Sequence, residues 1–423
     1  MASVLTIQDA SPRLDSLRAL DRLTFFLAAM QAGFGPFVAI HLADQGWSPE
    51  RIGVVLSAGG IAGLLAQVPT GELLDVVQSK RMLVGVGSVA VALGALILAL
   101  WPYFPAVLAA SILQGSTGGV LGLGVAAISL GLVGHKAAAD RFGRNQRFSS
   151  IGSLCAAGLM GVIGYFLPTR DIFFAAAILC LPVLLALVAI HAGDIHFGRS
   201  CGAPDCETRR PSRVHRKSLF RDRRVLVFAS CLFLFQLANA SILPLAGETL
   251  AHAEGRQSSL VLSALIIAPQ IIVALLAPWA GRTANSWGRR PLLLLGLGMV
   301  PIRALFFGTV TDPALLVAVQ ALDGITGATL GVLTALVAAD ITNGTGRFNL
   351  LQGLIGTLSG IGASLSTSLS GFAVQKFGHT VGFLGVAAVA LAAVVILLTL
   401  MPETKPADAA RHPPRSPRKR TRS

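Results

Sequence analysis

Apolar residues are arranged along this chain in long runs, each close to the ~20 residues that a helix needs to cross a bilayer. Short polar stretches separate the runs. Gly, Ser and Pro occur within several of them, and membrane helices tolerate these residues because neighbouring helices satisfy the freed backbone groups. The pattern predicts an all-α membrane protein with twelve transmembrane helices, at 22–43, 52–74, 82–101, 105–133, 149–168, 172–192, 225–249, 259–280, 291–310, 313–339, 349–373 and 380–401.

Composition supports this interpretation. Hydrophobic residues make up 53% of the 423 residues and charged residues 13%, whereas a soluble domain carries about 25% charged residues. A soluble chain could not cover its surface with so few charges, but lipid needs no such cover.

The formal net charge of +14 is distributed by side of the membrane. Of the 34 Lys and Arg, only Arg51, Arg170, Arg256 and Lys376 fall in the connections of one side, and Arg303 alone lies inside a span. Positive residues mark the cytoplasmic side, so we expect both termini to be cytoplasmic, as an even number of spans requires. The amino-terminal residues lack the apolar core and cleavage site of a signal peptide.

The two halves of the chain repeat each other. LQGSTGGVLG at 113–122 returns as LDGITGATLG at 322–331, AADRFGRNQRF at 138–148 returns as AADITNGTGRF at 338–348, and the segments 71–81 and 281–291 share their glycine and a basic residue. The offsets of 200 to 210 residues pair the first, second, fourth and fifth spans with the seventh, eighth, tenth and eleventh. The predicted organisation is a cytoplasmic segment 1–21, a six-helix bundle 22–192, a basic linker 193–224, a second six-helix bundle 225–401 and a basic, disordered tail 402–423.

The segment GELLDVVQSKR at 71–81 resembles the cytoplasmic signature of the major facilitator superfamily, Gly-x-Leu-x-Asp-Arg-x-Gly-Arg-Arg/Lys. Gly71, Leu73, Asp75 and Lys80 match it, and the copy at 281–291 keeps its glycine and arginines without the acid. A parallel repeat of six spans is also typical of that superfamily. The resemblance implies two bundles that rock around a central site, and it is greatest to the drug and metabolite efflux branch. The glycine-rich fifth span lacks the proline that antiporters of that branch usually carry there.

Polar side chains inside the spans are candidates for function because they are costly in lipid. By the resemblance, the polar residues that face a substrate cavity are Gln31, Gln67, Gln114, Gln236, Asn239 and Gln270. Asp323 is the only acidic residue deep in a span, so we predict that it couples transport to a proton. The alternative is a structural ion pair with Arg303, and the two roles are compatible.

The resemblance also implies a cytoplasmic gate, whose residues here are Gly71, Asp75, Lys80, Arg81, Gly281, Arg289 and Arg290. Charged residues at the cytoplasmic ends of other spans are candidates for pairs between the bundles: Asp140, Arg144, Arg147, Asp340 and Arg347. The simpler interpretation of these charges is membrane orientation with weak exposed ion pairs.

These features predict a secondary transporter that moves a small organic solute by alternating access, with proton-coupled efflux favoured. A solute importer or facilitator without proton coupling stays open, as does a sensor or scaffold that keeps the fold without transport. No paired carboxylates, metal ligands or nucleophile with a base occur within the spans, so an enzyme, a metal site and a bound cofactor are not expected. Cys201 and Cys206 alone are too few for a metal. We expect a monomer in a bacterial inner membrane, with lipid and a solute but no nucleic acid as partners.

Overall fold

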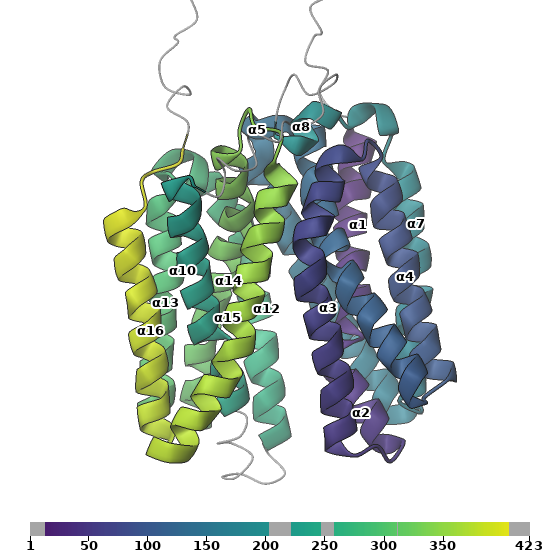
Figure 1. Cartoon of the computed structure of the whole chain (residues 1–423), viewed down its shortest axis with the longest axis vertical. Coiled ribbons are helices and arrows are strands. Elements are labelled where there is room, and N and C mark those ends of the chain that lie inside the picture. The colour runs from purple at the N-terminus through teal and green to yellow at the C-terminus, as the bar shows by residue number, and fades with distance from the viewer. Residues whose placement is uncertain (1–12, 203–220, 247–257, 311, 406–423) are drawn as a thin grey trace, which may run out of the picture.

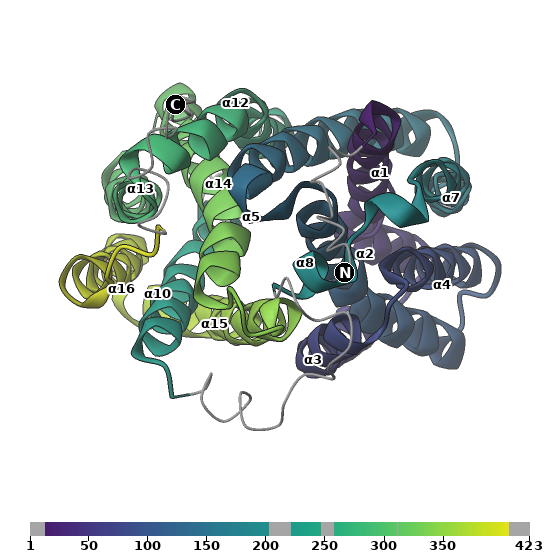
Figure 2. The ribbon, with the colours of Figure 1, turned by 90° about the horizontal axis from the view of Figure 1, so that it is seen from above.

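The computed structural model describes residues 13–202, 221–246, 258–310 and 312–405, and within these ranges all regular secondary structure is helical. The helices form two bundles that lie side by side (Figures 1 and 2). The first bundle contains α1 (Leu14–Ala32), α2 (Gly35–Asp44), α3 (Pro49–Val76), α4 (Lys80–Leu100), α5 (Phe104–Phe166), α6 (Arg170–Ile178), α7 (Cys180–Ala189) and, after it, the short α8 (Phe197–Cys201). The second contains α10 (Arg223–Asn239), α12 (Ser258–Trp287), α13 (Arg290–Thr309), α14 (Pro313–Ile341), α15 (Phe348–Phe377) and α16 (His379–Leu400).

Eleven segments of the described chain are long and apolar enough to cross a membrane. One of them, α5, has 63 residues, which at 1.5 Å per residue is about three times the ~30 Å of a bilayer core. Its backbone leaves helical geometry at Gly134, where φ is 68° and ψ is 179°. Both ends of α5 lie near the far end of α2, because Phe104 stacks on Trp47 and Thr169 contacts His41 at 2.9 Å. The chain therefore reverses at Gly134, and α5 supplies two crossings, which confirms the predicted twelve.

The start of α1, the reversal at Gly134 and the end of α16 lie at one end of the molecule, called here the inner end (top of Figure 1). This end corresponds to the side that positive charge predicts to be cytoplasmic. The opposite end is called the outer end.

Some element boundaries differ from those predicted. The first helix begins at Leu14, and the stretch 135–148, expected as a connection, is the beginning of the second crossing of α5. The polar residues of this stretch resemble a loop in sequence, because the apolar pattern starts only at 149. Of the linker, residues 193–202 and 221–224 are described, and they include α8 and the first residues of α10; Cys206 and most of the predicted tail lie outside the described residues.

The repeated decapeptide marks the same helix crossing in each half. A side chain at Gly115 of α5 would overlap the backbone of Gly59 in α3, and one at Gly324 of α14 would overlap Pro269 and Ile272 of α12. Small residues let membrane helices approach this closely. The third residue of the decapeptide has to be glycine at both the α5–α3 and the α14–α12 crossings, which accounts for its recurrence.

Buried apolar side chains join the two halves at the inner end. One core cluster includes Ala139 and Phe142 of α5 together with Leu333 and Val337 of α14, whereas most core residues of the first half form a cluster of their own. In Figure 1, α3 and α15 approach each other at the inner end and diverge toward the outer end. The halves are thus in contact around the inner end of the molecule.

Candidate functional site

Two adjoining cavities lie between the halves, with volumes of about 290 Å³ and 360 Å³. They share the lining residues Gln146, Gly331 and Thr334. Amide and hydroxyl side chains from both halves line the first cavity: Thr24, Gln31, Asn145, Gln146, Ser149, Thr334 and Gln352. The second is lined mainly by the second half and includes Gln236, Asn239, Asp323, Thr326 and Ser359. The combined space has the size of a small-solute site.

Among the residues that the structure describes, Asp323 is the one carboxylate that lines these cavities. It lies on α14, and its side chain is 28% exposed while pairing with the guanidinium of Arg303, which is 2% exposed on α13. A second nitrogen of Arg303 donates to the side-chain oxygen of Asn239 on α10. Three helices thus meet at this triad. A buried charge left without a partner costs several kcal/mol, so each charge depends on the other.

The predicted cavity residues divide into two groups. Gln31, Gln236 and Asn239 line the cavities. Gln67, Gln114 and Gln270 are absent from both linings. Instead, Gln67 lies at the contact of α3 with α15, where its side chain occupies the space beside Gly356.

Three amide residues that line the first cavity were missed from the sequence. Asn145 and Gln146 line this cavity but belong to the stretch 135–148. The sequence predicts a connection there, because the fifth span is predicted to begin only at 149. Gln352 lies within the predicted eleventh span, so its polarity in an apolar run was a signal that could have found it. Gln146 lies at the junction of the two cavities, against Gly331, where any larger residue would collide with its amide.

At the inner end, Asp75 joins the two halves. This residue is fully buried at the end of α3, and its carboxylate accepts hydrogen bonds from the backbone N–H groups of Asn349 and Leu350 at 3.1 Å and 2.9 Å. The side-chain amide of Asn349 donates to it as well, at 2.9 Å. These donors lie in the first turn of α15, where the helix dipole and free N–H groups favour an anion. The partner of Asp75 is therefore a helix end and not an arginine.

Two predicted gate glycines permit close backbone contact between the halves, one beside this bond and one at a separate contact. A side chain at Gly71 would overlap the carbonyl of Asn349, and one at Gly281 would overlap the carbonyl of Ala139. The first contact joins α3 to α15, and the second joins α12 to α5. The repeated signature thus lies at both inter-half contacts.

A second polar contact crosses the halves through Asp340, whose side chain is fully buried at the end of α14. Arg289 donates to one of its oxygens at 2.8 Å, and Nε2 of His135, just after the reversal in α5, lies 2.8 Å from the other. Together with the bond from Asp75 to α15, this contact forms what we call the inner latch.

The remaining gate candidates are not part of the inner latch. Lys80 is buried and donates to the carbonyls of Leu74 and Val77, which closes the end of α3. Arg290 donates to the carbonyl of Leu398 within its own half. Arg81 lies beside Lys80, and its Nε has no hydrogen-bond partner among the described residues.

Of the residues proposed to pair between bundles, Asp340 contacts the other half, through His135. Arg144 pairs with Asp21 inside its own half, which corrects the expected pairing across the halves. Asp140 and Arg147 are exposed and make no ion pair with a described residue, and Arg347 is buried at the start of α15.

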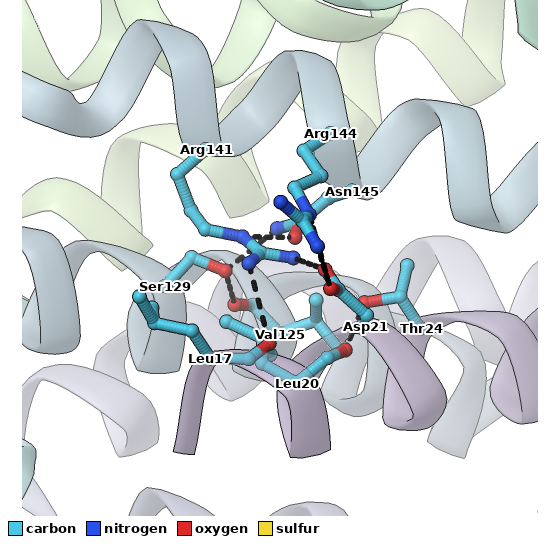
Figure 3. A network of polar contacts seen from close by, with 9 residues as sticks. All are labelled: Leu17, Leu20, Asp21, Thr24, Val125, Ser129, Arg141, Arg144 and Asn145. Atoms are coloured by element: carbon cyan, nitrogen blue, oxygen red, sulfur yellow. Dashed lines mark hydrogen bonds and ion pairs between the residues drawn. The ribbon is translucent and has the colours of Figure 1, made fainter. Parts of the chain in front are cut away.

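The network around Asp21 was not predicted, because the residue was assigned to the amino-terminal segment (Figure 3). Its carboxylate on α1 receives Arg141 and Arg144 from α5, and Arg141 also donates to Asn145 at 2.7 Å. Asn145 in turn donates to Ser129 at 2.7 Å. The network fixes the cavity-lining Asn145 between α1 and the two arms of α5.

Comparisons with known proteins agree with this architecture. The sequence model of the Major Facilitator Superfamily matches residues 23–268 and 228–423. The chain belongs to this superfamily. It is 36% identical over 410 residues to a protein of Mycobacterium tuberculosis described as "Uncharacterized MFS-type transporter Rv2456c", covering 95% of this chain and 96% of that protein.

Other similarities are partial or confined to the fold. Over 157 residues the chain is 33% identical to the class B tetracycline resistance protein of Escherichia coli, covering 37% of this chain and 36% of that protein. The crystal structure of the transporter FucP in its outward conformation superimposes with a TM-score of 0.73 at 14% identity, covering 90% of this chain and 97% of that chain. The protein is thus an MFS-type transporter, a multi-pass membrane protein and not an enzyme.

Proposed function

We propose that this transporter exports a small neutral or cationic organic solute in exchange for protons, and that Asp323 carries the coupling proton. The observation that carries the proposal is the position of Asp323: it lines the central cavity while pairing with a buried arginine. The similarity of part of the chain to a tetracycline resistance protein and to the multidrug resistance protein fnx1 of Schizosaccharomyces pombe favours export.

The lining supports the class of solute. Apart from Asp323, the polar side chains of both cavities are amides and hydroxyls, which donate and accept hydrogen bonds without adding charge. Arg303 is too buried to meet a solute directly, since its side chain is 2% exposed. An anionic solute would therefore meet a carboxylate and no free cation.

Coupling follows from the dependence of the two charges on each other. Protonation of Asp323 would leave the buried guanidinium of Arg303 without the negative charge that it pairs with, and the Asn239 oxygen, which also accepts from it, carries no charge. The present arrangement of α10, α13 and α14, which brings Asp323 and Arg303 together, would then lose stability relative to other conformations of the protein. A cationic group of the solute would compete with the proton for the same carboxylate, which is the differential interaction that an exchange mechanism requires.

The test uses purified protein in liposomes that contain a pH-reporting dye, with a panel of cationic, neutral and anionic solutes. Solute-dependent proton flux by the wild type and its loss in Asp323→Asn would support the proposal. Asp140→Asn is the matched control, because Asp140 is exposed, outside the cavities and without an ion pair among the described residues. Solute movement without proton flux, unchanged in Asp323→Asn, would contradict the proposed coupling and return Asp323 to a structural role.

A further inference from the structure

A third cavity of about 300 Å³ lies outside the transport pathway, at the inner end of the second half. Its walls are the first residues of α10, the beginning of α13 and the end of α16 from Thr399 to Pro402. Three arginines line it: Arg223, Arg224 and Arg290. We call it the arginine pocket.

The charges in this pocket are not balanced by the carboxylates nearby. Asp222 pairs with Arg224, whose NH2 lies 3.0 Å from its Oδ2. Glu403 accepts the backbone N–H groups of Arg289 and Arg290 at 2.8 Å and 3.1 Å, so its carboxylate is occupied as a helix cap. Arg223 makes no ion pair with a described residue, and Nε of Arg290 is buried without a hydrogen-bond partner there. The pocket therefore offers positive charge and free donors to an anion.

The position of the pocket identifies the source of that anion. All three arginines lie at the first residues of membrane-crossing helices, where the apolar spans end. Large apolar side chains next to them face outward, with exposed fractions of 53% for Leu226, 51% for Leu398 and 42% for Leu400. A phospholipid bound with its phosphate among the arginines would have apolar side chains along which to lay its acyl chains.

We infer that the arginine pocket binds the phosphate of an anionic phospholipid from the inner leaflet. Arginine is suited to this role because its planar guanidinium forms paired hydrogen bonds with phosphate oxygens. Basic pockets between membrane helices are a known means of headgroup recognition. A bound headgroup would tie together the inner ends of α10, α13 and α16, one residue from Arg289 of the inner latch.

The test measures thermal unfolding of the purified full chain in detergent while phosphatidylglycerol, phosphatidylcholine or inorganic phosphate is added at constant ionic strength. We expect saturable stabilisation by phosphatidylglycerol and none by the other two. In Arg223→Gln/Arg224→Gln the lipid concentration for half the effect should rise about tenfold or more, since each arginine near an anionic lipid contributes roughly fivefold. This variant keeps the Asp222 cap on α10, because that cap accepts the backbone N–H of residue 224.

The matched control is Arg13→Gln/Arg18→Gln, which removes two exposed arginines from the inner end of the first half. It should respond to phosphatidylglycerol as the wild type does. An equal loss of the phosphatidylglycerol effect in both variants would show that the lipid is attracted by the overall positive charge of the inner end, and this would overturn the proposed site. The absence of a saturable effect would overturn it as well, and an equal effect of inorganic phosphate at millimolar concentration would replace the lipid by a soluble anion. None of these readouts requires transport, so the result is independent of the proposed function.

Discussion

At the level of single residues, the buried charges of this protein are held in sets that cross helices. Asp21 receives two arginines from α5, and Asp323 receives Arg303 from the neighbouring helix. In a low-dielectric interior such sets contribute little net stability when complete, but losing one member leaves a charge buried and unpaired. Each set therefore fixes where its helices can lie.

Replacement of Asp21 by Asn should destabilise the protein by about 3–5 kcal/mol, because the side chain of Arg141 is 4% exposed and would remain charged without a carboxylate. Thermal unfolding of purified protein measures the effect. Asp15→Asn is the control on the same helix: its side chain is 79% exposed and 3.7 Å from Arg18, so about 0–1 kcal/mol is expected. Equal melting temperatures for the two variants would contradict the structural role of Asp21.

The sequence revealed some of these residues and concealed others. Asp323 and Arg303 were conspicuous because a charge inside an apolar run has few explanations, and the structure places them in contact. Asn145 and Gln146 were concealed because arginines surround them, and such a stretch resembles a loop. Helix rotation determines which amides face the cavity, and so does the distance over which the two halves touch along their helices. Neither quantity can be read from one sequence.

At the level of helices, glycines determine how closely elements cross. The twelve spans could be predicted because they depend on local hydrophobicity. The repeat could be predicted because the two halves of the sequence can be compared residue by residue. The reversal at Gly134 could not, because one glycine with a positive φ replaces the expected loop. Gly115 and Gly118 share the repeated phrase but differ in surroundings, which provides a direct comparison.

Gly115→Ala should destabilise the protein by about 1–3 kcal/mol, because the new methyl group would overlap the Gly59 carbonyl and force α3 from α5. Gly118→Ala, one turn later, has open space around it and should be neutral or slightly stabilising through higher helix propensity. Thermal unfolding of both variants in the same detergent tests this. A stable Gly115→Ala protein would show that this crossing is looser than described.

The inner end of α13 is capped by the carboxylate of Glu403, which follows α16. Partial burial alone would raise the pKa of Glu403, but hydrogen bonds from the backbone N–H groups of Arg289, Lys405 and Arg290 outweigh it and lower the pKa below its ordinary value of 4.5. A lowered pKa contributes stability above the unfolded-state value, and this contribution is lost as pH falls through the folded-state value.

Glu403→Gln should therefore cost about 1 kcal/mol at pH 7, the usual cost of losing a helix cap. The difference from the wild type should diminish as pH falls below about 4.5, where the wild-type carboxylate takes up its proton. Unfolding curves of both proteins across this pH range measure it. A difference that stays constant with pH would exclude the charge of Glu403 as the cause.

At the level of the whole molecule, the two halves touch at the inner end and leave polar cavities between them. The inner latch includes one carboxylate on a helix terminus and one His–Asp–Arg contact, both between residues far apart in sequence. Transport by alternating access requires this latch to open while the outer end closes. The superfamily and its two-bundle fold are shown by sequence and structure alike. We propose that the halves exchange between this conformation and one that is open at the inner end.

The most direct measurement is a pair of spin-label distances in liposome-reconstituted protein that has no native cysteines. Glu50 and Lys376 report on the outer end, where α3 begins and α15 ends, and Lys136 and Arg282 report on the inner end. Asp75→Ala removes three hydrogen bonds from the latch, a loss of about 2–3 kcal/mol that shifts a two-state equilibrium roughly 30- to 160-fold. We expect this variant to shorten the outer distance and to lengthen the inner one. Distances that stay the same at both ends, or that change at only one end, would contradict alternating access controlled by the inner latch.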